Sequence, residues 1–371
     1  MLRWTSLFLS NIKVAYALTP CAIGEPPVSR ARMLADLSYF ITEVYTKRPQ
    51  GWSFATKFNM GGTGFMHQFY LWSLVRALKP KHIIESGAYN GLGTWQLRQA
   101  APDAQVIVLS PKTPHIYVDQ HNDSRYFTDA HFRDFSSINW ACVDGLDRAS
   151  TVVFIDDHQS GYRRMLEAHA RGFHHLIFDD NMPAPQSDHF SVKGACAASK
   201  GEFGGLEKWD DFRGIKDDWG RWQHGQFNVT KQQLSMVGSS FLRAVNVYAE
   251  MPPLWSAGLP WPGVQPPLMS NEEAKNFVGQ HNEQLRDFRT EAIAYQGFLY
   301  VRTKPWYQVK PWSLYYPEKI TANGYAGIQP SEVVDCDQLD RGVAPALLKT
   351  TKIADDWKRN HGAGLSMRFG V

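Results

Sequence analysis

The chain of 371 residues lacks long apolar runs, basic clusters and closely spaced cysteines. No stretch reaches the roughly 18 apolar residues of a membrane-spanning helix, so no spanning segment is expected. The formal net charge is only +3, and Lys and Arg are not clustered along the sequence, so the sequence indicates neither nucleic acid nor an anionic membrane surface as a partner. The four cysteines form no C-x-x-C pair, which argues against a zinc ribbon or redox motif. Because their number is even, disulfides stay open.

Acidic side chains are also missing from the first 24 residues. Leu7-Phe8-Leu9 and an Ala15-x-Ala17 pattern are typical of a secretory signal, but Asn11 and Lys13 interrupt the apolar stretch. We interpret residues 1–29 as a targeting or disordered segment. The location of the protein stays open: it is in the cytoplasm, or in the secretory pathway or an organelle if this segment is a signal.

Hydrophobic residues make up 43% of the chain and charged residues 20%, which is the composition of a globular protein with a sizeable core. The length allows two or three domains, or one large domain with extensions. We interpret residues 30–305 as one α/β domain with an insertion at 182–240. Residues 306–371 form a C-terminal extension of unknown role.

Short apolar runs recur in the middle of the chain and predict strands at 82–85, 105–109, 151–155 and 175–178. Helical spacing lies before and between them, at 30–47, 71–78, 94–100 and 161–171. Strands that are apolar throughout and alternate with helices are typical of parallel strands covered on both faces. Further strands are expected within 127–135, 243–250 and 294–303, and a capping box at Ser270–Glu273 opens a helix.

A glycine-rich loop joins the first of these strands to the helix that follows. It reads Glu85-Ser-Gly87-Ala-Tyr89-Asn90-Gly91-Leu-Gly93. Glycines let the backbone turn sharply and approach a ligand, and the helix N-terminus points to the same place. The spacing differs from the dinucleotide fingerprint and from a P-loop. A plain tight turn is the alternative interpretation.

Acidic side chains follow two other predicted strands. Asp156-Asp157-His158 ends the strand at 151–155, and Asp179-Asp180-Asn181 ends the strand at 175–178. In a parallel sheet both groups lie at the edge that carries the glycine loop. Crowded carboxylates repel one another, and a divalent cation such as Mg²⁺ relieves that repulsion. His158 is compatible with a transition metal. The alternative is an acidic edge that makes helix caps and contacts water.

These motifs resemble class I S-adenosylmethionine-dependent methyltransferases over residues 65–185. The glycine loop is similar to the motif that holds the amino-acid part of the cofactor. Phe154-x-Asp156, Tyr162 and Asp180-Asn181 look like the metal-dependent catechol and caffeoyl-CoA O-methyltransferases and cephalosporin-hydroxylase-type relatives. The resemblance implies a Rossmann-like methyltransferase fold with a mostly parallel central sheet and helices on both faces. It implies metal ligands at Asp156, Asp180 and Asn181.

The resemblance also implies S-adenosylmethionine as cofactor. Its contacts would come from Glu85, Gly87, Tyr89, Asn90, Gly91, Gly93, Ser110 and Asp134. Asp134 lies near the position of an adenine-contacting acid in the family, but its sequence context favours a loop acid. Two departures stand out: Ser110 takes the place of the acid that binds the ribose, and Gln159 takes the place of a catalytic Lys. We therefore assign catalysis to Asp156 and to His158, as base or additional ligand.

The sequence predicts a methyltransferase that acts on an oxygen of a small molecule or sugar with help from a divalent metal, which would lower the pKa of the attacking hydroxyl. Two alternatives stay open. One is a metal-dependent hydrolase that uses the Asp-Asp-His cluster. The other is a non-catalytic methyltransferase-like binding protein.

Overall fold

The computed structural model describes residues 21–49, 63–183, 190–206, 208–216, 222–255, 265–281, 297–310 and 313–315. Most of the expected N-terminal segment and most of the C-terminal extension lie outside these residues. Within them, no helix combines the length and apolar character that a membrane crossing requires.

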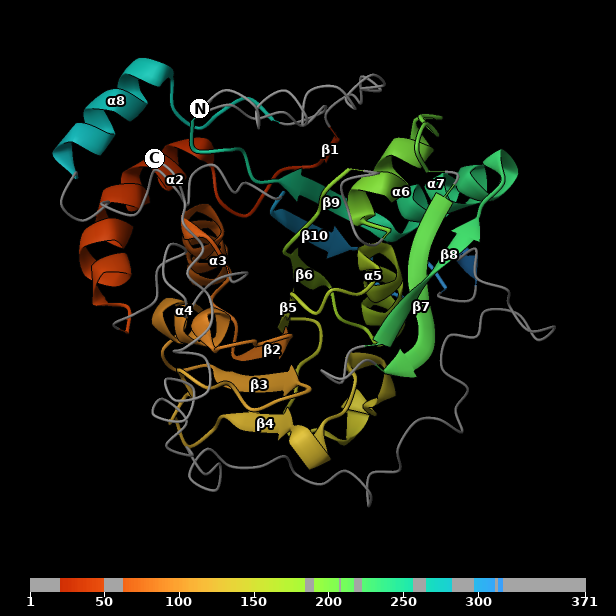
Figure 1. The fold of residues 1–371 in the computed structure, drawn as a ribbon, viewed down its shortest axis with the longest axis horizontal. Helices are drawn as coiled ribbons and strands as arrows, with labels where there is room; N and C mark the ends of the chain where they lie inside the picture. The colour runs from red at the N-terminus through yellow and green to blue at the C-terminus, as the bar shows by residue number, and fades with distance from the viewer. Residues whose placement is uncertain are drawn as a thin grey trace, which may run out of the picture.

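An eight-stranded sheet forms the centre of the molecule, in the order β1-β9-β10-β6-β5-β2-β3-β4 (Figure 1). Its strands are β1 (Ala22–Ile23), β2 (His82–Ser86), β3 (Gln105–Ser110), β4 (Arg125–Thr128), β5 (Val152–Ile155), β6 (His175–Phe178), β9 (Val245–Glu250) and β10 (Leu299–Thr303). Strands β2 to β6 are parallel. Strand β10 lies antiparallel between β6 and β9. A mixed α/β fold with a mostly parallel sheet is therefore confirmed.

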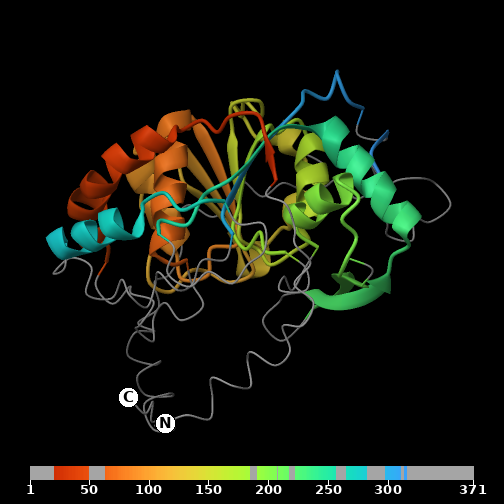
Figure 2. The same cartoon turned by 90° about the horizontal axis from the view of Figure 1, so that it is seen from above.

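Helices cover both faces of this sheet, which is why its central strands are apolar throughout (Figure 2). One face carries α2 (Arg30–Tyr39), α3 (Phe65–Leu78) and α4 (Leu92–Ala100), whose apolar side chains form one buried cluster. The other carries α5 (Gly161–Ala170), α6 (Val192–Ser199) and α7 (Lys231–Ala244), which belong to a second cluster. Helix α8 (Asn271–Gln280) starts at the predicted capping box.

The expected insertion at 182–240 contains more regular structure than its composition indicated. It holds α6, a hairpin of β7 (Lys208–Lys216) and β8 (Trp222–Asn228), and most of α7. Helix α6 consists mainly of small residues, so its sequence shows no apolar periodicity. The small residues allow α7 to pack closely: a Cβ on Gly238 of α7 would lie only 2.5 Å from Ser199 Cα of α6.

A disulfide joins Cys21, beside β1, to Cys196 on α6. Both cysteines are buried, and their Cα atoms lie 6.4 Å apart, within the usual range for a disulfide. Cys142 is also disulfide-bonded. The first bond fixes the edge strand of the sheet to a helix of its covering layer.

Buried Arg164 on α5 organises the segment that follows β5. Its guanidinium pairs with Asp134 at 2.5 Å, and with Asp157 and Glu167 at 2.9 Å each. Burial alone would raise the pKa of Asp134, but the charge and hydrogen bonds of Arg164 outweigh it and hold that pKa well below its usual range. Asp134 was expected to contact adenine; its carboxylate instead serves this network, as in the alternative interpretation of a loop acid.

Replacing Arg164 with Met should reduce the free energy of unfolding by roughly 3–5 kcal/mol at pH 7, because three carboxylates lose their buried partner. Asp134 and Glu167 have lowered pKa values in the native protein, so their stabilisation is present above the unfolded pKa and disappears as pH falls. In the variant their protonation relieves the penalty. The difference between native protein and variant should therefore narrow toward about pH 4.

Arg163→Met is the matched control, because Arg163 pairs with Glu167 from a side chain that is 27% exposed. We expect it to cost under about 1 kcal/mol. Denaturant unfolding of both variants across this pH range measures the effect. A cost for Arg164→Met that matches the control, or that does not change with pH, contradicts the assigned network.

Candidate active site at the carboxyl edge of the sheet

The glycine loop after β2 packs backbone against backbone on its neighbours. Gly87 and Gly91 have φ of +92° and +93°. A Cβ on Gly87 would lie 2.0 Å from the carbonyl oxygen of Asp156, and one on Gly91 would lie 2.1 Å from that of Tyr117. These positions require glycine both for conformation and for space. The loop is therefore built directly onto the acidic segment after β5.

Glu85 lies fully buried beneath the first turn of α4. Thr94 Oγ1 donates a hydrogen bond to Glu85 Oε2, whereas Oε1 is buried without a hydrogen-bond partner. Burial raises the pKa of Glu85 to about 8, against the opposing hydrogen bond from Thr94. A Cβ on Gly93 would lie 2.4 Å from Oε1, so this glycine makes room for the carboxyl group. A cation brought to Oε1 would supply the missing partner and favour the ionised form.

Strained backbone is concentrated at this edge. Among the described residues, positive φ outside glycine occurs at Lys79, which ends α3, and at Tyr89, Asp129, His158 and Asp180. The last four follow strands β2, β4, β5 and β6, respectively. Each such conformation costs on the order of 1–3 kcal/mol, and they cluster at functional sites. Asp129 was missed by the sequence analysis, although a strand-final acid was the signal used for Asp156 and Asp180.

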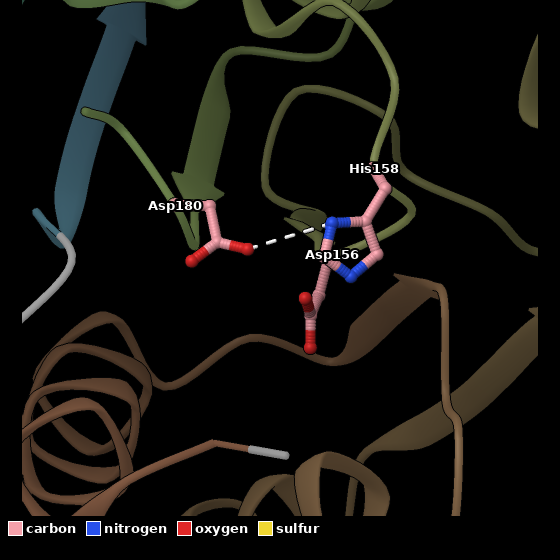
Figure 3. A group of neighbouring side chains, drawn as sticks. All are labelled: Asp156, His158 and Asp180. Atoms are coloured by element: carbon pink, nitrogen blue, oxygen red, sulfur yellow. Dashed lines mark ion pairs between the residues drawn. The ribbon is translucent and has the colours of Figure 1, made fainter. Parts of the chain in front are cut away.

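Asp156, His158 and Asp180 come together as Figure 3 shows. One ligand atom from each lies within 4.8 Å of the others, and His158 Nδ1 is 3.6 Å from Asp180 Oδ2. Burial raises the pKa of Asp156 well above its usual value, and Asp179, Asp180 and Glu85 raise it further. A divalent cation would offset this repulsion. The sequence-predicted pair of strand ends is therefore adjacent, with His158 between them.

A small pocket opens over this group. Its lining comes from the segments after β5 and β6 and from the start of α6, and includes all three side chains of the group. Asp157, the second acid of the Asp-Asp-His run, also borders it but accepts hydrogen bonds from Ser86 Oγ at 2.6 Å and Arg164 Nε at 2.9 Å. Asp157 therefore orients the segment, while Asp156 is available to a ligand.

Asn181, expected as a metal ligand, has a structural place instead. Its Oδ1 accepts the backbone N–H of Lys193 at 2.9 Å, and its Nδ2 donates to Tyr248 Oη at 3.0 Å. Tyr248 in turn donates to Glu250, whose other oxygen pairs with Lys193 Nζ at 2.6 Å. This buried network anchors the turn that carries Asp180. Sequence spacing did not reveal it, because its members come from β6, α6 and β9.

His67 on α3 is a further residue that the sequence did not single out. It is buried and pairs with Asp179 at the edge of the sheet. Burial lowers its pKa, but the charge and hydrogen bond of Asp179 outweigh burial, so the pKa is raised overall. The raised pKa favours the protonated, positively charged form of His67 beside the carboxylates of this edge.

Ser110, expected near the ribose of the cofactor, ends β3 beside the glycine loop. It is buried, and Gly87 N donates to the carbonyl of the preceding Leu109 at 2.8 Å. Next to it, Thr113 Oγ1 lies 2.8 Å from Thr128 Oγ1 and also donates to Asp129. Hydroxyl and carboxylate groups therefore continue the edge as far as β4.

No protein-family model and no curated protein matches the chain. Several solved structures are similar to the chain in fold. A putative O-methyltransferase from Klebsiella pneumoniae is 14% identical with a TM-score of 0.29, over 76% of this chain and 91% of that one. An SAH-bound methyltransferase of Podospora anserina is 10% identical, with a TM-score of 0.29, over 76% and 100%. A cyclopropane-fatty-acyl-phospholipid synthase-like protein from Lactobacillus casei is 11% identical, with a TM-score of 0.31, over 73% and 99%.

The first two of these proteins are named as methyltransferases. At such identities and TM-scores the likeness decides nothing about chemistry. The function therefore has to be inferred from this chain's own residues.

Proposed function

We propose that the protein is an S-adenosylmethionine-dependent methyltransferase that transfers a methyl group to an oxygen of a small molecule or sugar with the help of a divalent metal. One observation carries this: the glycine loop and the metal-competent acids are a single unit, because Gly87 packs on the backbone of Asp156. A cofactor on the loop and a substrate on the acids would therefore be neighbours.

The strand order supports a Rossmann-like fold. Strands β4-β3-β2-β5-β6 run in the order 3-2-1-4-5 along the chain, as in doubly wound sheets. Ligands of such sheets bind beyond the carboxyl ends of the strands where the order reverses, which here is between β2 and β5. The glycine loop follows β2 and Asp156 follows β5. Both groups therefore stand at the crevice.

The residues of the loop fit a cofactor that carries an ammonium group. Glu85 Oε1 is buried without a partner, and Tyr89 is 58% exposed in the loop above it. Glu85 would accept from the ammonium group, and Ser110 would stand where the ribose is expected. When bound, S-adenosylmethionine would supply a methyl group on a sulfonium centre. This chain's part is to hold donor and acceptor in line, which accounts for much of the rate enhancement in such displacements.

Asp156 and Asp180 would hold the metal through carboxylate oxygens, with His158 as a further ligand or as the base that takes the proton of the substrate hydroxyl. His158 is 45% exposed, so it is accessible to a substrate in the pocket. A bound metal would stabilise the substrate oxyanion. A metal-dependent hydrolase is the second candidate, because the lining of the pocket comes from the acidic segments rather than from the glycine loop.

Glu85→Gln should weaken binding of S-adenosylhomocysteine by about 10- to 100-fold, the usual range for losing a charge-assisted hydrogen bond. The native Glu85 has a pKa of about 8. A bound ammonium group lowers that pKa, so the native affinity should fall as pH decreases from 8 to about 6, and that of the variant should not. Titration calorimetry measures both effects. Gln resembles the protonated carboxyl group, so the thermal midpoint should stay within a few degrees.

The variant Gly87→Val cannot test cofactor binding separately from metal binding, because the Cβ of the valine would collide with the backbone of Asp156. If the native protein binds the metal but neither S-adenosylmethionine nor S-adenosylhomocysteine at any metal concentration, the methyltransferase proposal fails and the hydrolase takes its place. If it binds none of them, the non-catalytic alternative remains.

Asp156→Asn should lower the affinity for Mn²⁺, as a spectroscopic probe for Mg²⁺, by at least about tenfold, because it removes a charged ligand. It should also leave the metal-free protein as stable or more stable, since it removes a buried charge from a repulsive group. The neighbouring Asp157→Asn is the matched control: it should cost stability, through Ser86 and Arg164, and should lower metal affinity much less than Asp156→Asn, because Asp157 orients the segment and is not a proposed ligand. Equal metal affinities in the two variants would contradict the ligand assignment.

A further inference from the structure

A second feature lies away from the crevice, at the C-terminal end of α7 and in the described residues after β10, which are 304–310 and 313–315. Large apolar side chains are unusually exposed there: Trp306 by 50%, Tyr307 by 66% and Leu242 by 48%. Figure 2 shows the described part of this segment in blue, rising beyond the helices next to α7. Exposed aromatic side chains on a protruding segment indicate contact with another surface.

Hydrogen bonds hold the segment against α7. Lys304 N donates to Ala244 O at 2.7 Å and Lys304 Nζ to Leu242 O at 3.1 Å. Arg243 donates to Ser313 O at 2.8 Å. Within the segment, Lys310 Nζ lies 4.7 Å from the centroid of the Trp306 ring. The segment that carries the exposed rings is therefore held against the C-terminal end of α7, next to Leu242 and Arg243.

The charge of this surface has one sign. Its charged side chains are Arg243, Lys304 and Lys310, and neither 229–249 nor 297–317 contains an acidic residue. Basic side chains beside exposed Trp, Tyr and Leu are the combination that suits the interface of an anionic bilayer. The rings enter the headgroup region, and the cations stay with the lipid phosphates. An oligonucleotide is less suited to it, because Leu242 offers no partner to a base or phosphate.

We propose that this surface, made of Leu242, Arg243, Lys304, Trp306, Tyr307 and Lys310, docks the protein peripherally on a membrane that contains anionic lipid. The docking is independent of the proposed chemistry. The surface belongs to α7 and to the segment after β10, and none of its residues lines the pocket, so a docked molecule would keep its crevice open.

The test is co-sedimentation of the full chain with vesicles of phosphatidylcholine alone and of phosphatidylcholine with about one third phosphatidylglycerol. We expect binding to the anionic vesicles and much weaker binding to the neutral ones. Raising the salt to about 0.5 M should reduce it strongly, because the Debye length shortens to a few Å. The double variant Lys304→Gln/Lys310→Gln should lower the partition coefficient by roughly 20- to 30-fold, about fivefold for each cation.

Trp306→Ser/Tyr307→Ser should lower the partition coefficient by at least about tenfold, since two rings leave the interface. The matched controls are Lys47→Gln/Lys81→Gln, two exposed cations elsewhere, and Tyr39→Ser, an exposed ring on α2 at the other end of the molecule in Figure 2. These should bind like the native chain. The proposal is overturned if neither vesicle binds, or if test and control variants bind equally. Sedimentation velocity showing a dimer that the Trp306/Tyr307 variant abolishes would assign the surface to a second copy instead.

Discussion

Repulsion among carboxylates that are gathered at one edge of a sheet is the constraint on which this structure depends. Asp156, Asp179, Asp180 and Glu85 interact electrostatically there, and Glu85 is fully buried. The protein answers in three ways. His67 pairs with Asp179, and Arg164 pairs with Asp157. Burial raises the pKa of Glu85 to about 8, which favours its uncharged form at neutral pH. Asp156 and Asp180 remain close to each other and to His158, and that is the group a metal would use.

The central strands were predictable because burial on both faces leaves an unmistakable pattern. The runs at 82–85, 105–109, 151–155 and 175–178 correspond to β2, β3, β5 and β6 within about a residue. The pairing of β10 was not predictable. Nothing local in a strand says whether it will enter a sheet antiparallel, between two strands that are distant in sequence. Helix α6 escaped for a different reason, because its small residues carry no apolar stripe, although they are what lets α7 pack.

The same distinction separates the site residues. Glu85, the loop glycines and the strand-final acids follow their strands directly, so topology alone gathers them at one edge. His67, and the network of Lys193, Glu250 and Tyr248, come from other elements and meet the site only through tertiary packing. Asn181 and Asp134 show the limit of resemblance. Each occupies a position that suggested a ligand contact, yet its hydrogen-bonding atoms are engaged by neighbouring protein groups.

The disulfide between Cys21, beside β1, and Cys196 on α6 limits the cellular compartments in which the chain can complete this structure. Such bonds form and persist in oxidising surroundings and are rare where glutathione keeps thiols reduced. The two half-cystines are 175 residues apart, so the bond closes a loop that contains the five parallel strands β2 to β6. Chain made in a reducing cytosol would carry the sheet without that closure. The oxidation state of Cys21 in protein taken from its native source therefore records the compartment in which the molecule matured.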